Sequence, residues 1–280
     1  MKVLICVNDL IADEPGLLQG KLIARYFDVQ ITLLHILPPK KSPGDRTRAE
    51  KLLEEANRVL GIYPVTRKVR RGDPGKRIVK EAHRGNYDLV IVTVSHIGEH
   101  PRALGIHRQL LKDIPCCVMV VKNPRAEVRR MLICTGGLQL AEPVIEVGAR
   151  FALAFNAEVT LFHVAANVPT MYTGLKTIEE TLSELLQTDT PVSRHLHRGA
   201  EILAGYNVEA ELKLRHGEAV YEIVREIDLE HYDMVVIGST GATTRFKKLL
   251  YGNLTEEIVD AVGIPVLVVN QNHPLPPQTT

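Results

Sequence analysis

The sequence has almost no net charge and no long apolar run. Lys and Arg together number 34 and Asp and Glu 33, so the formal net charge is +1 and no overall field attracts nucleic acid. No apolar run approaches the roughly 20 residues that span a bilayer, and the run near the first residue is too short for a signal peptide. These absences predict a protein with neither nucleic-acid nor membrane partners.

Cysteines are few, and all four lie within apolar runs, at Cys6, Cys116, Cys117 and Cys134. Their spacing does not fit a metal site, and unpaired core cysteines are typical of reducing compartments. We therefore expect reduced core residues in a cytoplasmic protein.

Residues for catalysis or metal binding form no recognisable pattern. The chain has no G-x-S-x-G motif and no cysteine in an exposed polar setting, so we predict no catalytic residue. His96 and His100 are four residues apart, but no set of carboxylates completes a metal site beside them. We predict that these two, together with His107, His195 and His197, are exposed histidines.

A basic cluster lies on one predicted strand and consists of Arg67, Lys68, Arg70 and Arg71. These side chains alternate between the two faces of the strand, and no aromatic residue lies between them. A nucleic-acid site would combine basic and aromatic side chains. The cluster is therefore predicted to be a solvated surface.

The chain consists of two copies of one pattern, which 280 residues can accommodate as two domains. LIC at 4–6 recurs at 132–134, TLLH at 32–35 as TLFH at 160–163, YD at 87–88 at 232–233, and IP at 114–115 at 264–265. The offsets only grow along the chain, so the second copy carries insertions, the largest between His163 and Gly217. His35 and His163 share one position, which predicts a hydrogen-bonded histidine near a strand end.

Each copy alternates short apolar runs with amphipathic segments. The predicted strands include 3–7, 30–37, 65–71, 89–94, 116–121, 234–237 and 265–269. This order predicts an α/β fold of two tandem doubly wound domains, with a mostly parallel sheet and helices on both faces. The predicted organisation is a first domain at 1–122, a linker at 123–130, a second domain at 131–270 and a flexible tail at 271–280.

Two helix details follow from local patterns. Leu18, Leu22 and Tyr26 are four residues apart, which predicts that they share one face of the first helix. Thr47 and Glu50 have the spacing of a capping box, which predicts the start of a second helix that ends at Gly61.

A glycine-bearing loop follows the strand at 234–237 and is the best candidate site. Its glycines can let the backbone approach a phosphate, and its polar side chains can donate hydrogen bonds. The candidate residues are Gly238, Ser239, Thr240, Gly241, Gly252, Asn253 and Thr255, with counter-charge from Arg245, Lys247 and Lys248. In the alternative interpretation, the glycines only serve a tight turn and Asn253 only caps a helix.

The strand sequences TLLHIL and TLFHVA, YDLVIV and YDMVVIGSTG, and IPCCVMVV and IPVLVV carry a family resemblance. In both copies, over about residues 1–270, the chain resembles the universal stress protein family. The resemblance implies a five-stranded parallel sheet in each domain, and pairing of the last strands at 116–121 and 265–269. It also implies a motif G-x2-G-x9-G-[ST], through which some members bind ATP.

The chain departs from that motif in each copy. Gly238 and Gly241 match its start. However, ten residues instead of nine lie between Gly241 and Gly252, and Asn253 replaces Ser or Thr. Gly136 stands where ATP-binding members usually carry an Asp near the adenosine.

In the first copy, Thr93 and His96 replace the two leading glycines, while Asn8 and Asp9 end the first strand. Side chains at Thr93 and His96 would block a close backbone approach. The first domain is therefore expected to be structural and to bind no ATP.

Two functions remain open at this point. In the first, a stress-response protein binds ATP, with Mg²⁺, in its second domain as a regulatory ligand, and it is not an enzyme beyond weak ATP hydrolysis. In the second, the same fold binds no nucleotide and acts as an interaction or scaffold protein. Both are compatible with a homodimer, and the link to stress comes from the resemblance alone.

Overall fold

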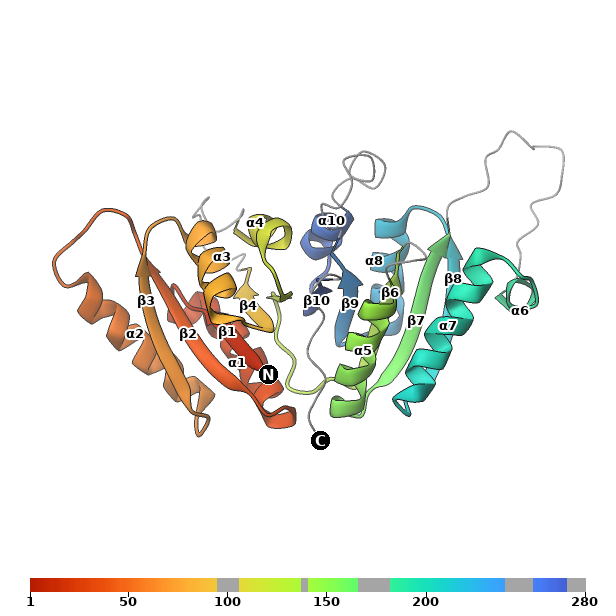
Figure 1. Ribbon diagram of the computed structural model, residues 1–280, viewed down its shortest axis with the longest axis horizontal. Coiled ribbons are helices and arrows are strands. Elements are labelled where there is room, and N and C mark those ends of the chain that lie inside the picture. Colours follow the sequence, from red (N-terminus) through yellow and green to blue (C-terminus); the bar gives the residue numbers. More distant parts are fainter. Residues whose placement is uncertain (95–105, 137–140, 166–181, 240–253, 271–280) are drawn as a thin grey trace.

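The computed structural model describes residues 1–94, 106–136, 141–165, 182–239 and 254–270. Within them, a single ten-stranded sheet has the order β3-β2-β1-β4-β5-β10-β9-β6-β7-β8 (Figure 1). The strands of the first half are β1 (Lys2–Cys6), β2 (Gln30–Leu37), β3 (Val65–Arg71), β4 (Leu89–Thr93) and β5 (Cys117–Val121). Those of the second are β6 (Arg130–Thr135), β7 (Glu158–Ala165), β8 (Ala210–His216), β9 (Met234–Gly238) and β10 (Val266–Val269).

Each half is a five-stranded parallel sheet, and the two sheets join in the middle. β5 and β10 pair antiparallel, with Leu267 opposite Met119. The predicted α/β class, the two similar halves and the pairing of the last strands are therefore confirmed. The domain boundaries themselves stay a prediction.

Helices cover both faces of the sheet (Figure 1). One core lies under α1 (Leu10–Tyr26), α2 (Asp45–Leu60), α5 (Glu142–Phe155) and α7 (Pro191–Gly205). The other lies under α3 (Pro74–Gly85), α4 (Ile106–Asp113), α8 (Ala219–Glu230) and α10 (Leu254–Ala261). The short α6 (Leu182–Leu186) precedes α7. The inner strands are buried along most of their length because they lie between two helical layers, whereas the edge strands β3 and β8 carry charged side chains and are only partly buried.

The two halves share one core at α1 and α5. The ring of Phe27 lies 4.9 Å from that of Phe151, and Tyr26 packs edge-on against Phe155 at 5.1 Å. Aromatic contacts of this kind add to the free energy of burial. The halves are therefore joined by packing as well as by the sheet.

Leu18, Leu22 and Tyr26 all lie on α1 at the predicted spacing, but only Leu22 of the three is buried. The helix turns Leu17 and Ile23 to the sheet and places Gly20 directly over Ile5. The predicted start of the second helix is wrong. The second helix begins at Asp45 rather than at Thr47, with Gly44 before it.

That early start has a tertiary cause. The carboxylate of Asp45 accepts the Ser42 N–H and is paired with Arg71 on β3. The predicted end at Gly61 is confirmed, and the glycine has a φ of 79° there.

The four cysteines are buried and free, as predicted. Burial raises the pKa of the Cys6, Cys116 and Cys134 thiols, so they are held in the neutral form. Within the described residues, no helix is long and apolar enough to cross a membrane.

Candidate functional site

The candidate site of the second half lies where the strand order reverses. The chain runs from β6 to β7 and β8 on one side, and then returns to β9 and β10 on the other. In sheets of this kind, ligands bind outside the carboxyl ends of the two strands at the reversal. Here β6 ends at Thr135, which Gly136 follows, and β9 ends at Gly238, which Ser239 follows.

Gly136 leaves this place open. The residue is exposed, and no atom lies within 4 Å of the position that a Cβ would take. A ligand could therefore approach the backbone at the end of β6 without displacing a side chain.

Thr255 joins the two sides of the glycine-bearing segment. It lies in the first turn of α10 and is buried, and its Oγ1 donates a hydrogen bond of 3.1 Å to the carbonyl of Gly238. The start of α10 is thereby held at the end of β9. The proton of this hydroxyl serves the fold, so the predicted role of Thr255 as a phosphate donor would need a different rotamer.

The backbone N–H of Ser239 is also engaged. It donates to the carbonyl of Val269 at 2.9 Å and continues the pairing of β9 with β10. The backbone N–H of Ser239 is therefore not available to a ligand. The other predicted residues, Thr240, Gly241, Gly252 and Asn253, lie outside the described residues, as do Arg245, Lys247 and Lys248.

The corresponding place in the first half is filled by Thr93 at the end of β4. Its Oγ1 accepts a hydrogen bond of 3.1 Å from the N–H of Gly16 in α1. A Cβ at Gly16 would meet this oxygen at 2.6 Å, so the contact is close. His96 lies outside the described residues.

The acidic residues of the first half hold the start of α1. The side chain of Asp9 accepts the N–H of Ala12, as a helix cap does. The carboxylate of Asp13, which the sequence analysis missed, accepts the N–H of Asn8 at 2.6 Å and of Asp9 at 3.0 Å. Burial raises the pKa of Asp13 although these bonds oppose the shift. In the sequence, the position of Asp13 four residues after the capping residue Asp9 is the one signal for this role.

The universal stress protein family model matches residues 1–122 and 127–270. The chain belongs to the universal stress protein family. No curated protein matches it.

Solved structures include tandem members of similar length. A universal stress protein from Archaeoglobus fulgidus DSM 4304 is 16% identical, with a TM-score of 0.72 and 96% of both chains covered. A functionally unknown protein from Pseudomonas aeruginosa PAO1 is 20% identical, with a TM-score of 0.69, over 97% of this chain and 92% of that one.

A shorter relative corresponds to half of the chain. It is a universal stress protein family protein from Arabidopsis thaliana with AMP bound, 25% identical, over 46% of this chain and 95% of that one, with a TM-score of 0.33.

Two histidines hold the first-strand ends in this universal stress protein, as predicted. Nδ1 of His35 donates to the carbonyl of Val7 at 2.8 Å, and Nδ1 of His163 donates to that of Thr135 at 3.0 Å. Each bond ties the end of a second strand to the end of a first. The shared histidine therefore has a structural role beside each strand reversal.

The prediction of exposed histidines is wrong for two of the five. His107 is buried and donates through Nε2 to Asp260 at 2.9 Å, while His195 is buried with its ring 5.9 Å from that of His163. Both partners come from distant parts of the chain, which local spacing does not indicate. His197 is exposed as predicted, and His96 and His100 lie outside the described residues.

The basic cluster is not simply a solvated surface. Lys68 and Arg70 pair with the buried carboxylate of Glu81 at 2.8 and 2.9 Å, and Arg71 pairs with Asp45. Among the four, Arg67 fits the prediction, because it is exposed and has no ion-pair partner within the described part of the chain. A buried carboxylate requires such partners, because desolvation of an unpaired charge is costly.

Metal ligands do not gather in the parts of the chain that the structure describes. No group of three or more His, Cys, Asp or Glu side chains there is arranged to hold a metal ion.

Proposed function

We propose that the second half of this universal stress protein binds an adenine nucleotide, ATP with Mg²⁺, as a regulatory ligand. The observation that carries the proposal is the open place at Gly136, beside Gly238, at the reversal of strand order. Such a place accepts phosphate-bearing ligands in other α/β sheets. The ligand would control the protein's state rather than be consumed, and we assign no catalytic residue.

The residues present fit the phosphates of the nucleotide. Gly238 would let a phosphate come close to the backbone, and Ser239 follows it directly. Gly136, at the position where ATP-binding members carry an Asp near the adenosine, would leave room for the adenosine at the end of β6. From the adjoining segment, Thr240, Gly241, Gly252 and Asn253 would supply backbone and side-chain donors. Mg²⁺ would bind mainly to the phosphates and neutralise their charge, as it does where few protein ligands are offered.

The two halves are proposed to differ in this function. Thr93 fills the position in the first half that Gly238 leaves free of a side chain in the second. The first half would then serve as a structural partner. Binding is accordingly expected at about one site per chain.

The test is a calorimetric titration of the full chain with ATP–Mg²⁺. Gly136→Val places a branched side chain in the open position, and Asn8→Val makes the matched change at the end of β1. We expect binding to the wild type and to Asn8→Val, and affinity at least about tenfold weaker in Gly136→Val, a loss of about 1.4 kcal/mol. Binding that survives Gly136→Val unchanged would move the ligand elsewhere.

A complete lack of binding at millimolar ATP would overturn the nucleotide proposal. The alternative function, an interaction or scaffold protein of the same fold, would then take its place.

A further inference from the structure

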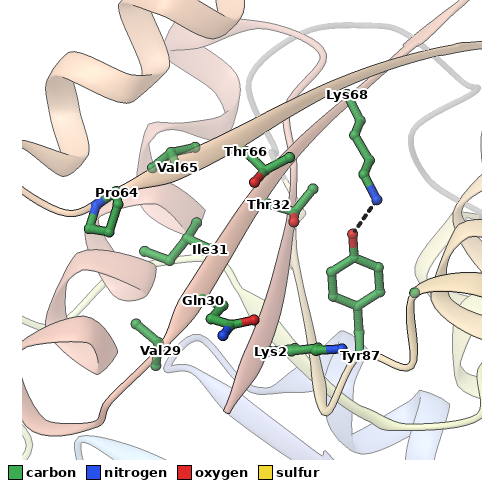
Figure 2. A pocket seen from close by; sticks show the side chains of 11 residues that line it. Lys2, Val29, Gln30, Ile31, Thr32, Pro64, Val65, Thr66, Lys68 and Tyr87 are labelled. Atoms are coloured by element: carbon green, nitrogen blue, oxygen red, sulfur yellow. Dashed lines mark hydrogen bonds between the residues drawn. The ribbon is translucent and has the colours of Figure 1, made fainter.

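A hollow of about 390 Å³ lies at the amino ends of the first-half strands (Figure 2). The candidate nucleotide site, by contrast, lies in the second half and at the carboxyl ends of its strands. The volume of the hollow falls within the roughly 300–1,000 Å³ typical of small-molecule sites. The polar lining comes from β1, β2, β3 and the residues before β4. It consists of Lys2, Gln30, Thr32, Thr66, Lys68 and Tyr87.

The second half contains equivalent positions with which the lining of the hollow can be compared. The strand registers correspond, because Lys2 pairs with Gln30 as Arg130 does with Glu158. Thr32 likewise lies opposite Thr66 as Thr160 does opposite Glu211. The two hollows can therefore be compared position by position.

In the second half, the equivalent region holds ion pairs between residues of that half. The guanidinium of Arg130 lies 5.1 Å from the centre of the Tyr232 ring and pairs with Glu230 at 3.3 Å. Lys213 pairs with Glu211 at 3.6 Å and with Glu230 at 3.4 Å. The cations there are neutralised by neighbouring carboxylates.

In the first half, those carboxylates are missing while the amines remain. Gln30, Thr66 and Gly85 stand where the second half has Glu158, Glu211 and Glu230. The match of Gly85 with Glu230 follows from the left-handed residues Asn86 and His231, which come directly after them. Asp88 and Asp233 accept the backbone N–H groups of Lys2 and Arg130 in the same way, so they do not alter the comparison.

The result is an excess of positive charge at the hollow. Lys68 and Arg70 share the single carboxylate of Glu81, and the ammonium of Lys2 has no ion-pair partner among the described residues. Lys2, Lys68 and Arg70 are thus accompanied by the one buried carboxylate of Glu81, which pairs with Lys68 and Arg70, and by Asp88, which accepts the backbone N–H of Lys2. An anion would supply the charge that the second half provides from its own side chains.

Hydrogen-bond donors are also unused here. Lys68 donates to the hydroxyl oxygen of Tyr87 at 3.2 Å, as Figure 2 shows, and within the described part of the chain the hydroxyl proton of Tyr87 meets no acceptor. The hydroxyl of its counterpart Tyr232 donates its proton to the carboxylate of Glu226 and is also hydrogen-bonded to the hydroxyl of Thr160. Thr32 and Thr66 add two hydroxyl groups that face each other across β2 and β3.

We propose that this hollow binds the carboxylate or phosphate group of a small molecule. Lys2 and Lys68 supply charge, and Tyr87, Thr32 and Thr66 donate hydrogen bonds. The site is independent of the nucleotide proposal, because it lies in the other half and at the opposite ends of the strands.

The experiment follows backbone amide signals of the full chain by NMR, with inorganic phosphate and succinate as separate probes. We expect saturable shifts confined to the residues around the hollow, for at least one probe. Shifts with phosphate alone would identify a phosphate site, and shifts with succinate alone a carboxylate site. Saturation by neither probe would overturn the proposal.

A double variant tests the charge argument directly. Gln30→Glu with Thr66→Glu restores two carboxylates of the second half at exposed positions and should weaken binding about tenfold or more. Thr47→Glu with Gln187→Glu makes the same charge change at exposed positions elsewhere. Equal affinity in the two double variants would contradict the proposed site.

Discussion

Some residues occur at matching positions of both halves and make the same contacts there, which indicates that the fold requires them. Glu81 and Glu226 are both buried, and each holds a Lys and an Arg from the neighbouring edge strand. Each is also linked to the tyrosine of the repeated YD pair, directly for Tyr232 and through Lys68 for Tyr87. The repetition indicates that this buried charge network stabilises the universal stress fold in each half.

Removing the charge of Glu226 should therefore destabilise the chain. Its side chain is only 1% exposed and lies 2.8 Å from Lys213. Glu226→Gln leaves the ammonium without its buried partner and should lower the free energy of unfolding by about 3 kcal/mol. Glu54→Gln, which breaks an exposed pair with Arg58, should cost less than about 1 kcal/mol. Urea unfolding measures both, and equal losses would contradict the assigned role.

Buried histidines should make stability depend on pH. Burial lowers the pKa of His163 and of His195, with a smaller lowering from His216 and His163 respectively. Below about pH 6.5 the unfolded chain takes up protons that these folded histidines do not. The contribution of these histidines to stability is therefore fully present above that pH. As the pH drops, the free energy of unfolding falls by up to about 1.4 kcal/mol per pH unit for each histidine.

The variant His195→Gln tests this assignment. It should reduce the loss of stability between about pH 7.5 and about pH 5.5, whereas His197→Gln, at an exposed position of the same helix, should leave the loss unchanged. The measurement is the urea midpoint at each pH. The same pH dependence in both variants would show that other groups are responsible.

At the scale of elements, α4 and α10 meet across the junction of the halves with opposite charges. Arg108 pairs with Asp260 at 2.5 Å and Lys112 pairs with Glu256 at 3.0 Å, so α4 supplies the cations and α10 the anions. The buried His107 adds a partly buried hydrogen bond to Asp260. Because α10 also carries Thr255, this charged contact links the candidate nucleotide site to the first half.

Truncation of Asp260 should loosen that contact. Asp260→Ala leaves the buried Nε2 of His107 without its acceptor, which should cost about 1–3 kcal/mol. Glu257→Ala, at an exposed position of the same helix, should change stability by less than about 0.5 kcal/mol. Thermal unfolding compares them, together with hydrogen exchange at Val118 and Val268 in the central strand pair. Unchanged exchange there in Asp260→Ala would mean that the helices do not secure the junction.

How far sequence predicts structure also differs between elements. The strand at 65–71 was predicted with its observed bounds, because its apolar and polar pattern is local. The start of α2 was missed because Asp45 is fixed by Arg71, far along the chain. At the candidate site, the strand that leads to Gly238 followed from sequence, but the hydrogen bond of Thr255 to the carbonyl of Gly238 did not. Nor did the engagement of Ser239 with Val269, since it depends on which strand lies beside β9.

The whole molecule is one continuous sheet whose two halves have diverged at both ends of their strands. At the carboxyl ends, Thr93 fills the first half while Gly136 leaves the second open. At the amino ends, the second half is filled by Arg130 and Glu230 while the first half holds the hollow beside Tyr87. Each half is therefore expected to bind a different ligand at a different end.

The most direct test of the nucleotide claim is hydrogen–deuterium exchange of the full chain with and without ATP–Mg²⁺. We predict slower exchange at Gly136, at Ser239 and along α10 when the nucleotide is present. We expect no change at Asn8 and Gly16, the matching region of the first half. Slower exchange in the first half instead, or no change in either, would contradict the account.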